Sequence, residues 1–241
     1  MPSLPMLDAK TNMNHSPHVV ILGAGASIAS TIRNPEKHGK QLPGMADLVE
    51  VIGLQSILEH HGVAYEGQNF EAFYDELSQG GQHPKLLEEI ESAVYDYFAG
   101  LQLPDEATIY DYLILTLRDK DIIATFNWDP FLAQAFVRNG ETIGFEHLPK
   151  IVFLHGNVFV GVCTACKTCG WSMNRCSKCG QPFSPSKLLY PVSQKDYTSD
   201  EFIKDQWDIV RAHIKHAYYI SIFGYSAPVT DAEARSLMLS V

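Results

Sequence analysis

The sequence contains no cysteine outside the stretch from Cys163 to Cys179, where all five of its cysteines lie. A disulfide framework distributes cysteines along a short secreted chain, so this crowding instead predicts a metal site in a reducing compartment. The chain also lacks any apolar run of the roughly 18 uncharged residues that a membrane helix needs. Its first residues lack the apolar block of a signal peptide. We therefore expect a cytoplasmic protein with no membrane partner.

Positive charge is scarce as well. Lys and Arg number 18 against 28 Asp and Glu, which gives a formal net charge of −10 at pH 7. Because binding to a phosphate backbone relies on clustered cations, we expect no direct contact with nucleic acid. An anionic small molecule remains compatible with this charge, since backbone amides can hold a phosphate locally. Hydrophobic residues make up 46% of the 241 residues, enough for the core of one domain with a small insert.

Four short apolar runs alternate with stretches in which apolar residues recur at helical spacing. The runs are residues 18–22, 121–126, 151–154 and 218–223, and the helical stretches are 45–60, 69–78, 86–98, 109–117 and 200–217. Such runs are typical of strands buried on both faces, and their alternation with helices predicts βαβ units. We expect an α/β fold, a Rossmann-like parallel sheet with helices on both faces. The expected domains are a flexible leader (1–17), a Rossmann-like domain (18–160 and 188–241) and an inserted zinc-ribbon module (161–187).

Small or polar residues follow each of the four runs. They are Gly23, Ala24, Gly25 and Ser27 after the first, Asn127 and Asp129 after the second, His155 after the third, and Gly224 and Ser226 after the fourth. Ligands of open parallel sheets bind beyond the carboxyl ends of the strands, so these residues are predicted to form one site. The dinucleotide fingerprint G-x-G-x-x-G is not matched, because Ile28 occupies its last position.

Each of these residues also has a purely structural explanation, and the sequence leaves it open. The glycine turn is explained equally by a tight connection from strand to helix with Ser27 as N-cap. Asp129 directly precedes Pro130 and is predicted to cap a helix whatever else it does. His155 and Asn127 fit an ordinary strand end and a turn cap, and Ser226 fits a turn.

Two motifs in the cysteine stretch have the form C-x-x-C-G and contain Cys166 with Cys169 and Cys176 with Cys179. Each motif places two thiolates on one turn, and two such turns close a tetrahedral zinc site of the structural type. Because each glycine lets backbone amides face the sulfur atoms, we predict these four cysteines as the ligands. Cys163 begins another C-x-x-C pair and is left as a spare thiol.

The order and spacing of these motifs resemble the sirtuin family, most closely its sirtuin-like NAD-binding branch in prokaryotes with a zinc ribbon. The resemblance covers residues 18–230 and rests on five motifs: the glycine turn, the Asn127 segment, the His155 segment, the cysteine ribbon and the Gly224 segment. It implies that NAD+ is the substrate and lies between the Rossmann-like domain and the ribbon. Zinc would be a structural ion.

The resemblance also implies a role for each residue that follows a strand. Gly23, Ala24 and Gly25, with Ser27, would line the NAD+ phosphates, Asn127 and Asp129 would hold the nicotinamide ribose, His155 would be the general base, and Gly224 and Ser226 would contact the adenosine side. Asn127 suits a water or ribose hydroxyl because it adds no charge. The chemistry would be cleavage of the nicotinamide–ribose bond.

Two departures from typical sirtuin deacetylases favour water as the acceptor. Those enzymes have a Phe-Arg pair after the glycine loop, where this chain has Ile32 before Arg33. Residues 188–196 also differ from the apolar segment that pairs with an acyl-lysine peptide in deacetylases. We therefore expect an NAD+ hydrolase, with an NAD-dependent protein-lysine deacylase acting on an acyl-lysine peptide as the alternative. A non-catalytic sensor of NAD+ or ADP-ribose is the second alternative.

Three further expectations follow from the resemblance. The family's first zinc cysteine comes eight residues after the histidine, which selects Cys163 here and conflicts with the glycine-based choice of Cys169 that we keep. The family has a further strand after the position of Ser226 that completes the adenine site, so either the chain is a fragment or another element closes the pocket. We expect a homo-oligomer or an operon-encoded partner, and because many members of this branch are encoded in antiphage operons, antiphage defence is the expected role.

Overall fold

The computed structural model describes residues 16–32, 41–193, 195–227 and 231–239 of the chain. The leader expected at residues 1–17 lies almost entirely outside this part. Within the described ranges, none of the helices has the length and apolarity required to cross a membrane.

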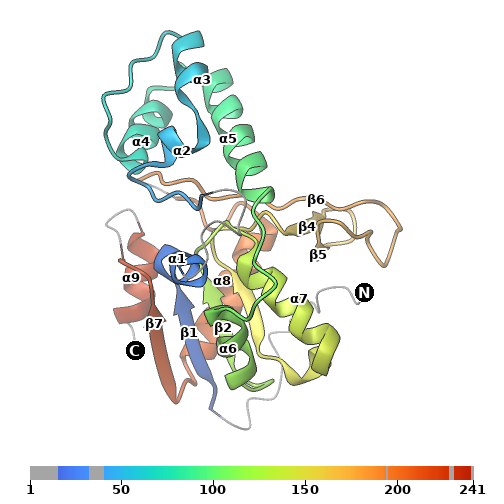
Figure 1. Cartoon of the computed structure of the whole chain (residues 1–241). Helices are drawn as coiled ribbons and strands as arrows, with labels where there is room; N and C mark the ends of the chain where they lie inside the picture. Colours follow the sequence, from blue (N-terminus) through green and yellow to red (C-terminus); the bar gives the residue numbers. More distant parts are fainter. Residues whose placement is uncertain (1–15, 33–40, 194, 228–230, 240–241) are drawn as a thin grey trace.

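Four parallel strands form the central sheet in the order β3-β2-β1-β7 (Figure 1). They are β1 (His18–Leu22), β2 (Ile122–Thr125), β3 (Lys150–Phe153) and β7 (Tyr219–Phe223). Each lies within two residues of an apolar run in the sequence, because a strand covered on both faces needs apolar residues at every position. β7, at one edge of the sheet, is the exception, whereas β3 at the other edge is largely buried. Tyr218 and Tyr219, which an apolar run predicts to be core residues, are 86% and 60% exposed.

Helices cover both faces of the sheet, as predicted. They are α1 (Ala24–Thr31), α2 (Leu48–Ile52), α3 (Gln55–His60), α4 (Phe70–Gly80), α5 (Pro84–Ala99), α6 (Ile109–Thr116), α7 (Phe131–Ile143), the short 3₁₀ helix η2 (Phe145–His147), α8 (Glu201–Ile214) and α9 (Ala232–Leu239). Alternate residues of the strands point to opposite faces. Val20 and Leu22 pack in the core with α1, α6 and α7, whereas Val19 and Ile21 pack with α8 and α9.

Helices α2 to α5 form a group that the sequence did not separate from the sheet. Figure 1 shows them on the side of the sheet where β1 ends and α1 begins. The helix expected over residues 45–60 is divided in two by Gly53, which adopts a left-handed conformation with φ of 82°. In α5 the predicted apolar stripe is buried (Leu86, Ile90, Val94 and Phe98). The group therefore stands over the carboxyl ends of the strands.

A second, antiparallel sheet carries the cysteines. Its strands are β4 (Val160–Cys163), β5 (Thr168–Trp171) and β6 (Ser184–Pro185), in the order β5-β4-β6. This ribbon begins directly after β3 and its following loop, and it returns to the main domain at Ser186. The observed architecture is thus the predicted α/β fold with an inserted cysteine ribbon.

Candidate functional site

The residues that follow the four strands come together at one edge of the sheet. Leu22 is paired in register with Thr125 of β2 and with Phe223 of β7, and Thr125 is paired with Phe153 of β3. The four predicted segments therefore start side by side, as expected for parallel strands. Gly224 and Ser226 are exposed there, whereas Asn127 and His155 are buried.

The glycine turn packs directly against the end of β7. A Cβ atom added to Gly25 would lie 2.8 Å from Gly224 Cα, and one added to Gly23 would lie 2.6 Å from Gly224 O. Gly224 itself has a φ of 66°. These glycines are therefore required for close backbone approach, which supports the tight-turn explanation. The Gly25 amide already donates to Gly224 O at 2.9 Å, so it is not free for a phosphate in this geometry.

Ser27 does not cap α1, contrary to the structural explanation that the sequence left open. Gly23 is the N-cap, and Ser27 lies inside the helix with no exposed surface. Its hydroxyl donates to Asp129 Oδ2 at 2.6 Å and lies 2.6 Å from the Tyr110 hydroxyl. Ser27 thus links the glycine turn to the segment after β2.

Asn127 completes this buried network. Its side-chain amide donates to Gly23 O at 2.9 Å and to Ser27 Oγ at 2.8 Å. Both amide hydrogens therefore fix the glycine turn against the end of β2. This observation assigns a structural role to Asn127 in addition to the contact with ribose that the resemblance implies.

Asp129 was predicted to be the N-cap of a helix, but the N-cap of α7 is Pro130, so Asp129 lies one residue before the cap. Its Oδ1 atom still accepts from the Phe131 amide at 3.1 Å, so the carboxylate satisfies the first turn of the helix. Burial raises the pKa of Asp129 to about 6, against the lowering effect of the Ser27 hydrogen bond. Asp129 is therefore held inside the fold.

His155 is 6% exposed, and its ring packs among aromatic side chains. The Phe126 ring lies edge-on at 4.8 Å between centroids, and the Tyr197 ring lies roughly parallel at 6.2 Å. The Nε2 atom is enclosed, and no described residue is its hydrogen-bond partner. Burial, and next the positive charge of Lys195, lower the pKa of His155 to about 3, against the opposing effect of Asp231. The imidazole is thus neutral at pH 7, which is the protonation state that a general base requires.

Four side chains around His155 were not predicted from the sequence as site residues: Lys195, Tyr197, Tyr225 and Asp231. Lys195 Nζ forms an ion pair with Asp231 Oδ1, and both side chains are 4% exposed. Asp231 Oδ2 accepts from the Tyr225 hydroxyl at 2.9 Å. Because Lys195 and Asp231 are 36 residues apart in the chain, no local spacing marks them as a pair.

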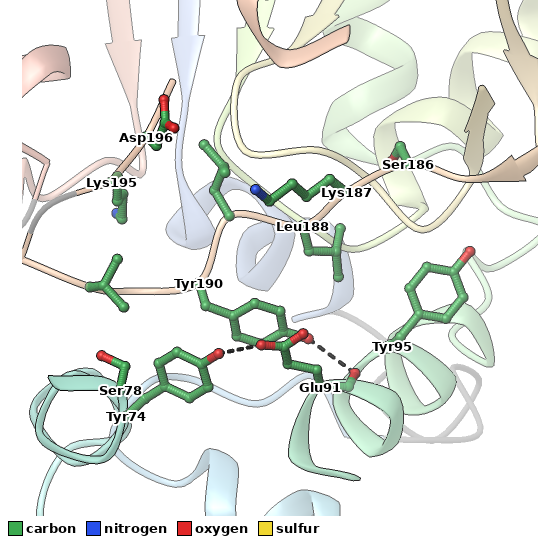
Figure 2. Close-up of a pocket in the computed structure, with 12 residues that line it drawn as sticks. Tyr74, Ser78, Glu91, Tyr95, Ser186, Lys187, Leu188, Tyr190, Lys195 and Asp196 are labelled. Atoms are coloured by element: carbon green, nitrogen blue, oxygen red, sulfur yellow. Dashed lines mark hydrogen bonds between the residues drawn. The ribbon is translucent and has the colours of Figure 1, made fainter. Parts of the chain in front are cut away.

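A cavity of about 500 Å³ lies next to this group, between helices α4 and α5 and the chain that returns from the ribbon, residues 186–196. Figure 2 shows Tyr74, Glu91 and Tyr190 along one side of it, with Lys195 farther along the returning chain. The Tyr74 hydroxyl donates to Glu91 Oε1 at 2.5 Å, and the Tyr190 hydroxyl donates to Glu91 O at 3.0 Å. Lys195 therefore belongs both to the cavity wall and to the surroundings of His155.

The cysteine ribbon gathers four thiols, but not the four that we predicted. The Sγ atoms of Cys163, Cys166, Cys176 and Cys179 all lie within 4.8 Å of one another. Cys163 Sγ and Cys179 Sγ are 3.7 Å apart. Four thiolates bound to a tetrahedral zinc ion at about 2.3 Å lie about 3.8 Å from each other. The cluster thus fits a structural zinc ion with no open coordination position, and Cys163 replaces Cys169 in it.

The alternation of side chains along a strand explains this correction. In the ribbon Cys163 is paired with Thr168, and Val162 is paired with Cys169. Thr168 Oγ1 lies 3.3 Å from Cys176 Sγ, so the first pair faces the cluster. Cys169 faces the main core, where burial raises the pKa of its thiol to about 11. The eight-residue spacing from His155 to Cys163 was the signal that identified the correct cysteine.

The glycine argument failed because a different residue follows the first pair of ligands. The positive-φ position after Cys179 is Gly180, with φ of 73°, and its counterpart after Cys166 is Lys167, with φ of 50°. Gly170 has no positive φ and lies within β5 instead. A non-glycine residue can hold this conformation at a cost of about 1 kcal/mol.

No protein-family model matches the sequence, and no curated protein matches it. Among solved structures, the chain is similar to a mutant Sir2 homologue in complex with 2'-O-acetyl ADP ribose, at 19% identity and a TM-score of 0.48, over 96% of this chain and 78% of the other. It is also similar to a Sir2 homologue in complex with NAD, at 19% identity and a TM-score of 0.44, over 93% of this chain and 73% of the other.

Proposed function

We propose that this protein cleaves the nicotinamide–ribose bond of NAD+ and transfers the ADP-ribosyl group to water. The observation that carries the proposal is the position of His155. A neutral imidazole with an enclosed, unpartnered nitrogen lies at the same edge of the sheet as the glycine turn and Asn127. Four of the five motifs on which the resemblance to sirtuins rests thus meet at the edge of the sheet where this neutral imidazole lies.

The chemistry requires little from the protein beyond orientation, a dry pocket and one base. The bond between ribose C1' and the pyridinium nitrogen breaks, and its electron pair stays on nitrogen, so neutral nicotinamide leaves. Water forms the new bond to C1', and its proton passes to His155 and then to solvent. Asn127 holds the glycine turn in place and adds no charge beside the oxocarbenium-like transition state.

Contacts of the returning chain (residues 186–196) favour water over an acyl-lysine peptide as the acceptor. In deacetylases of the sirtuin family, the corresponding segment pairs with that peptide. Here Ser193 N donates to Asp75 Oδ1 at 2.8 Å, and Lys195 pairs with Asp231. The segment is therefore bound to its own chain at two neighbouring positions, Ser193 and Lys195.

The ribbon has no chemical step in this proposal. Cys163, Cys166, Cys176 and Cys179 would hold zinc, whose contribution is to fold the ribbon. Since all four ligand positions are taken by thiolates, zinc would activate no water.

The test measures release of nicotinamide from NAD+ by the full chain, with and without an acetylated peptide. We expect nicotinamide and ADP-ribose in equal amounts without the peptide, and a loss of at least about 100-fold in His155→Ala. Binding of NAD+ should survive that substitution, because the imidazole acts mainly on the transition state. His216→Ala, at an exposed histidine of the same chain, is the matched control and should keep full activity.

Each other outcome selects a different function. Release that requires the peptide and yields an acylated ADP-ribose would identify a deacylase. Binding of NAD+ with no release under either condition, also after any operon-encoded partner is added, would identify a sensor domain.

A further inference from the structure

The carboxylate of Asp231 lies close to His155. Its Oδ1 atom is 3.7 Å from His155 Nε2, too long for a hydrogen bond but close enough to form one after a small shift. Such contacts are often long in unliganded enzymes and shorten when substrate binds. His155 Nε2 has no other partner among the described residues, so Asp231 is the acceptor available to it.

Two donors fix the orientation of this carboxylate. Lys195 Nζ pairs with Oδ1, and the Tyr225 hydroxyl donates to Oδ2. Tyr225 is in turn fixed by its ring, which stacks on Phe126 at 4.4 Å. Lys195 belongs to the returning chain, whereas Tyr225 and Asp231 lie between β7 and α9; together they aim one carboxylate oxygen at His155. If this contact served only to join the returning chain to the start of α9, the ion pair would be sufficient and the hydrogen bond from Tyr225 would not be needed.

We propose that Asp231 is the positioning residue of His155, and that Lys195 and Tyr225 hold its carboxylate in place. The inference rests on the proposed function and adds three residues that no resemblance assigned. Asp231 holds Nε2 as an N–H group, which leaves the lone pair on Nδ1 as the proton acceptor. When the ring takes a proton from water, the carboxylate stabilises the imidazolium. Lys195 partly offsets that negative charge, so the base stays neutral before the reaction.

The titratable and charged groups that surround His155 are Lys195, Tyr197, Tyr225 and Asp231. Phe126 and Trp207 complete the surroundings and carry no charge. Removal of Asp231 or of Lys195 should therefore move the pKa of His155 in opposite directions. A purely structural ion pair would also shift this pKa, so the tautomer of the ring and kcat decide between the two roles.

The experiment uses nitrogen-15 histidine labelling of the full chain and NMR titration, with His155→Gln to assign the signal. In the wild-type protein we expect the Nε2–H tautomer at neutral pH. In Asp231→Asn, Lys195 keeps the amide oxygen at the Oδ1 position, so the ring faces a neutral acceptor and the pKa of His155 should fall below its wild-type value. The rate constant kcat for nicotinamide release should fall at least about 100-fold while KM changes only a few-fold.

In Lys195→Met the pKa of His155 should rise by at least about one unit, because the ring becomes the only cation beside Asp231. Lys204→Met removes a cation from an exposed ion pair on α8 and is the matched control, with no expected change in tautomer or pKa. A wild-type Nδ1–H tautomer would overturn the proposal without any variant. So would an unchanged pKa in Lys195→Met.

These measurements separate the two proposals. If the tautomer and pKa respond as expected but NAD+ is not cleaved, the coupling of Asp231 to His155 stands and the proposed function fails. If NAD+ is cleaved while the NMR signals stay constant, only the positioning role fails.

Discussion

The choice between Cys163 and Cys169 as a zinc ligand gives the sharpest test of the ribbon. Cys163→Ser removes one of four thiols whose sulfur atoms lie within 4.8 Å of one another. Since zinc binding of this type contributes on the order of 10 kcal/mol to folding, loss of one ligand should release most of the metal and unfold the ribbon. Cys169→Ser leaves the cluster intact and should cost about 1–3 kcal/mol, because it buries a hydroxyl in the apolar core.

The assay is metal analysis of both variants after dialysis, together with thermal unfolding with and without a chelator. Wild-type protein and Cys169→Ser should retain about one zinc per chain, and the chelator should lower the melting temperature of both. Cys163→Ser should retain little zinc and should not respond to the chelator. Retention of zinc by Cys163→Ser together with its loss from Cys169→Ser would refute the assignment.

Two further predictions concern the glycine turn and acid stability. Gly25→Ala should destabilise the protein by about 1–3 kcal/mol in urea unfolding, because the new Cβ would lie 2.8 Å from Gly224 Cα. Gly44→Ala is the matched control: its new Cβ has its nearest contact at 3.5 Å, so the loss of stability should be smaller. His155 has a pKa of about 3 in the folded protein and about 6.5 when unfolded, so the unfolded state binds the extra proton between these values and stability falls as the pH drops below 6.5. Between pH 7 and pH 4.5 this loss amounts to about 3 kcal/mol, and His155→Gln should show a correspondingly smaller loss; equal losses in both proteins would contradict the lowered pKa.

The central sheet was predictable because strands covered on both faces leave continuous apolar runs in the sequence. The exposure of Tyr218 and Tyr219 was not predictable, because their apolar run has the same character as that of β3, which is buried at the opposite edge of the sheet. The same run predicts an interior strand and an edge strand equally well. Edge position is a property of the topology, which no local pattern records.

In the site, too, the residues marked by a local sequence pattern were predicted, whereas those brought together by tertiary packing were not. His155 and Asn127 directly follow strands, so the sequence identified their segments. Lys195 and Asp231 meet only after the returning chain and the start of α9 have packed together. Cys169 was chosen wrongly because the alternation of β5, which turns its thiol toward the core, depends on pairing with β4.

The position of β1 between β2 and β7 has a consequence for synthesis on the ribosome. His18 Nε2 lies 2.9 Å from Ser221 Oγ, although the two residues are 203 positions apart in the chain. Closure of so long a loop is slow, because its entropic cost precedes any gain from strand pairing. Until Tyr219–Phe223 has emerged, β1 presents an open edge that other chains can pair with. Translation that pauses before β7 should therefore expose nascent chains to aggregation, and pairing of the four-stranded sheet should finish only once β7 has emerged.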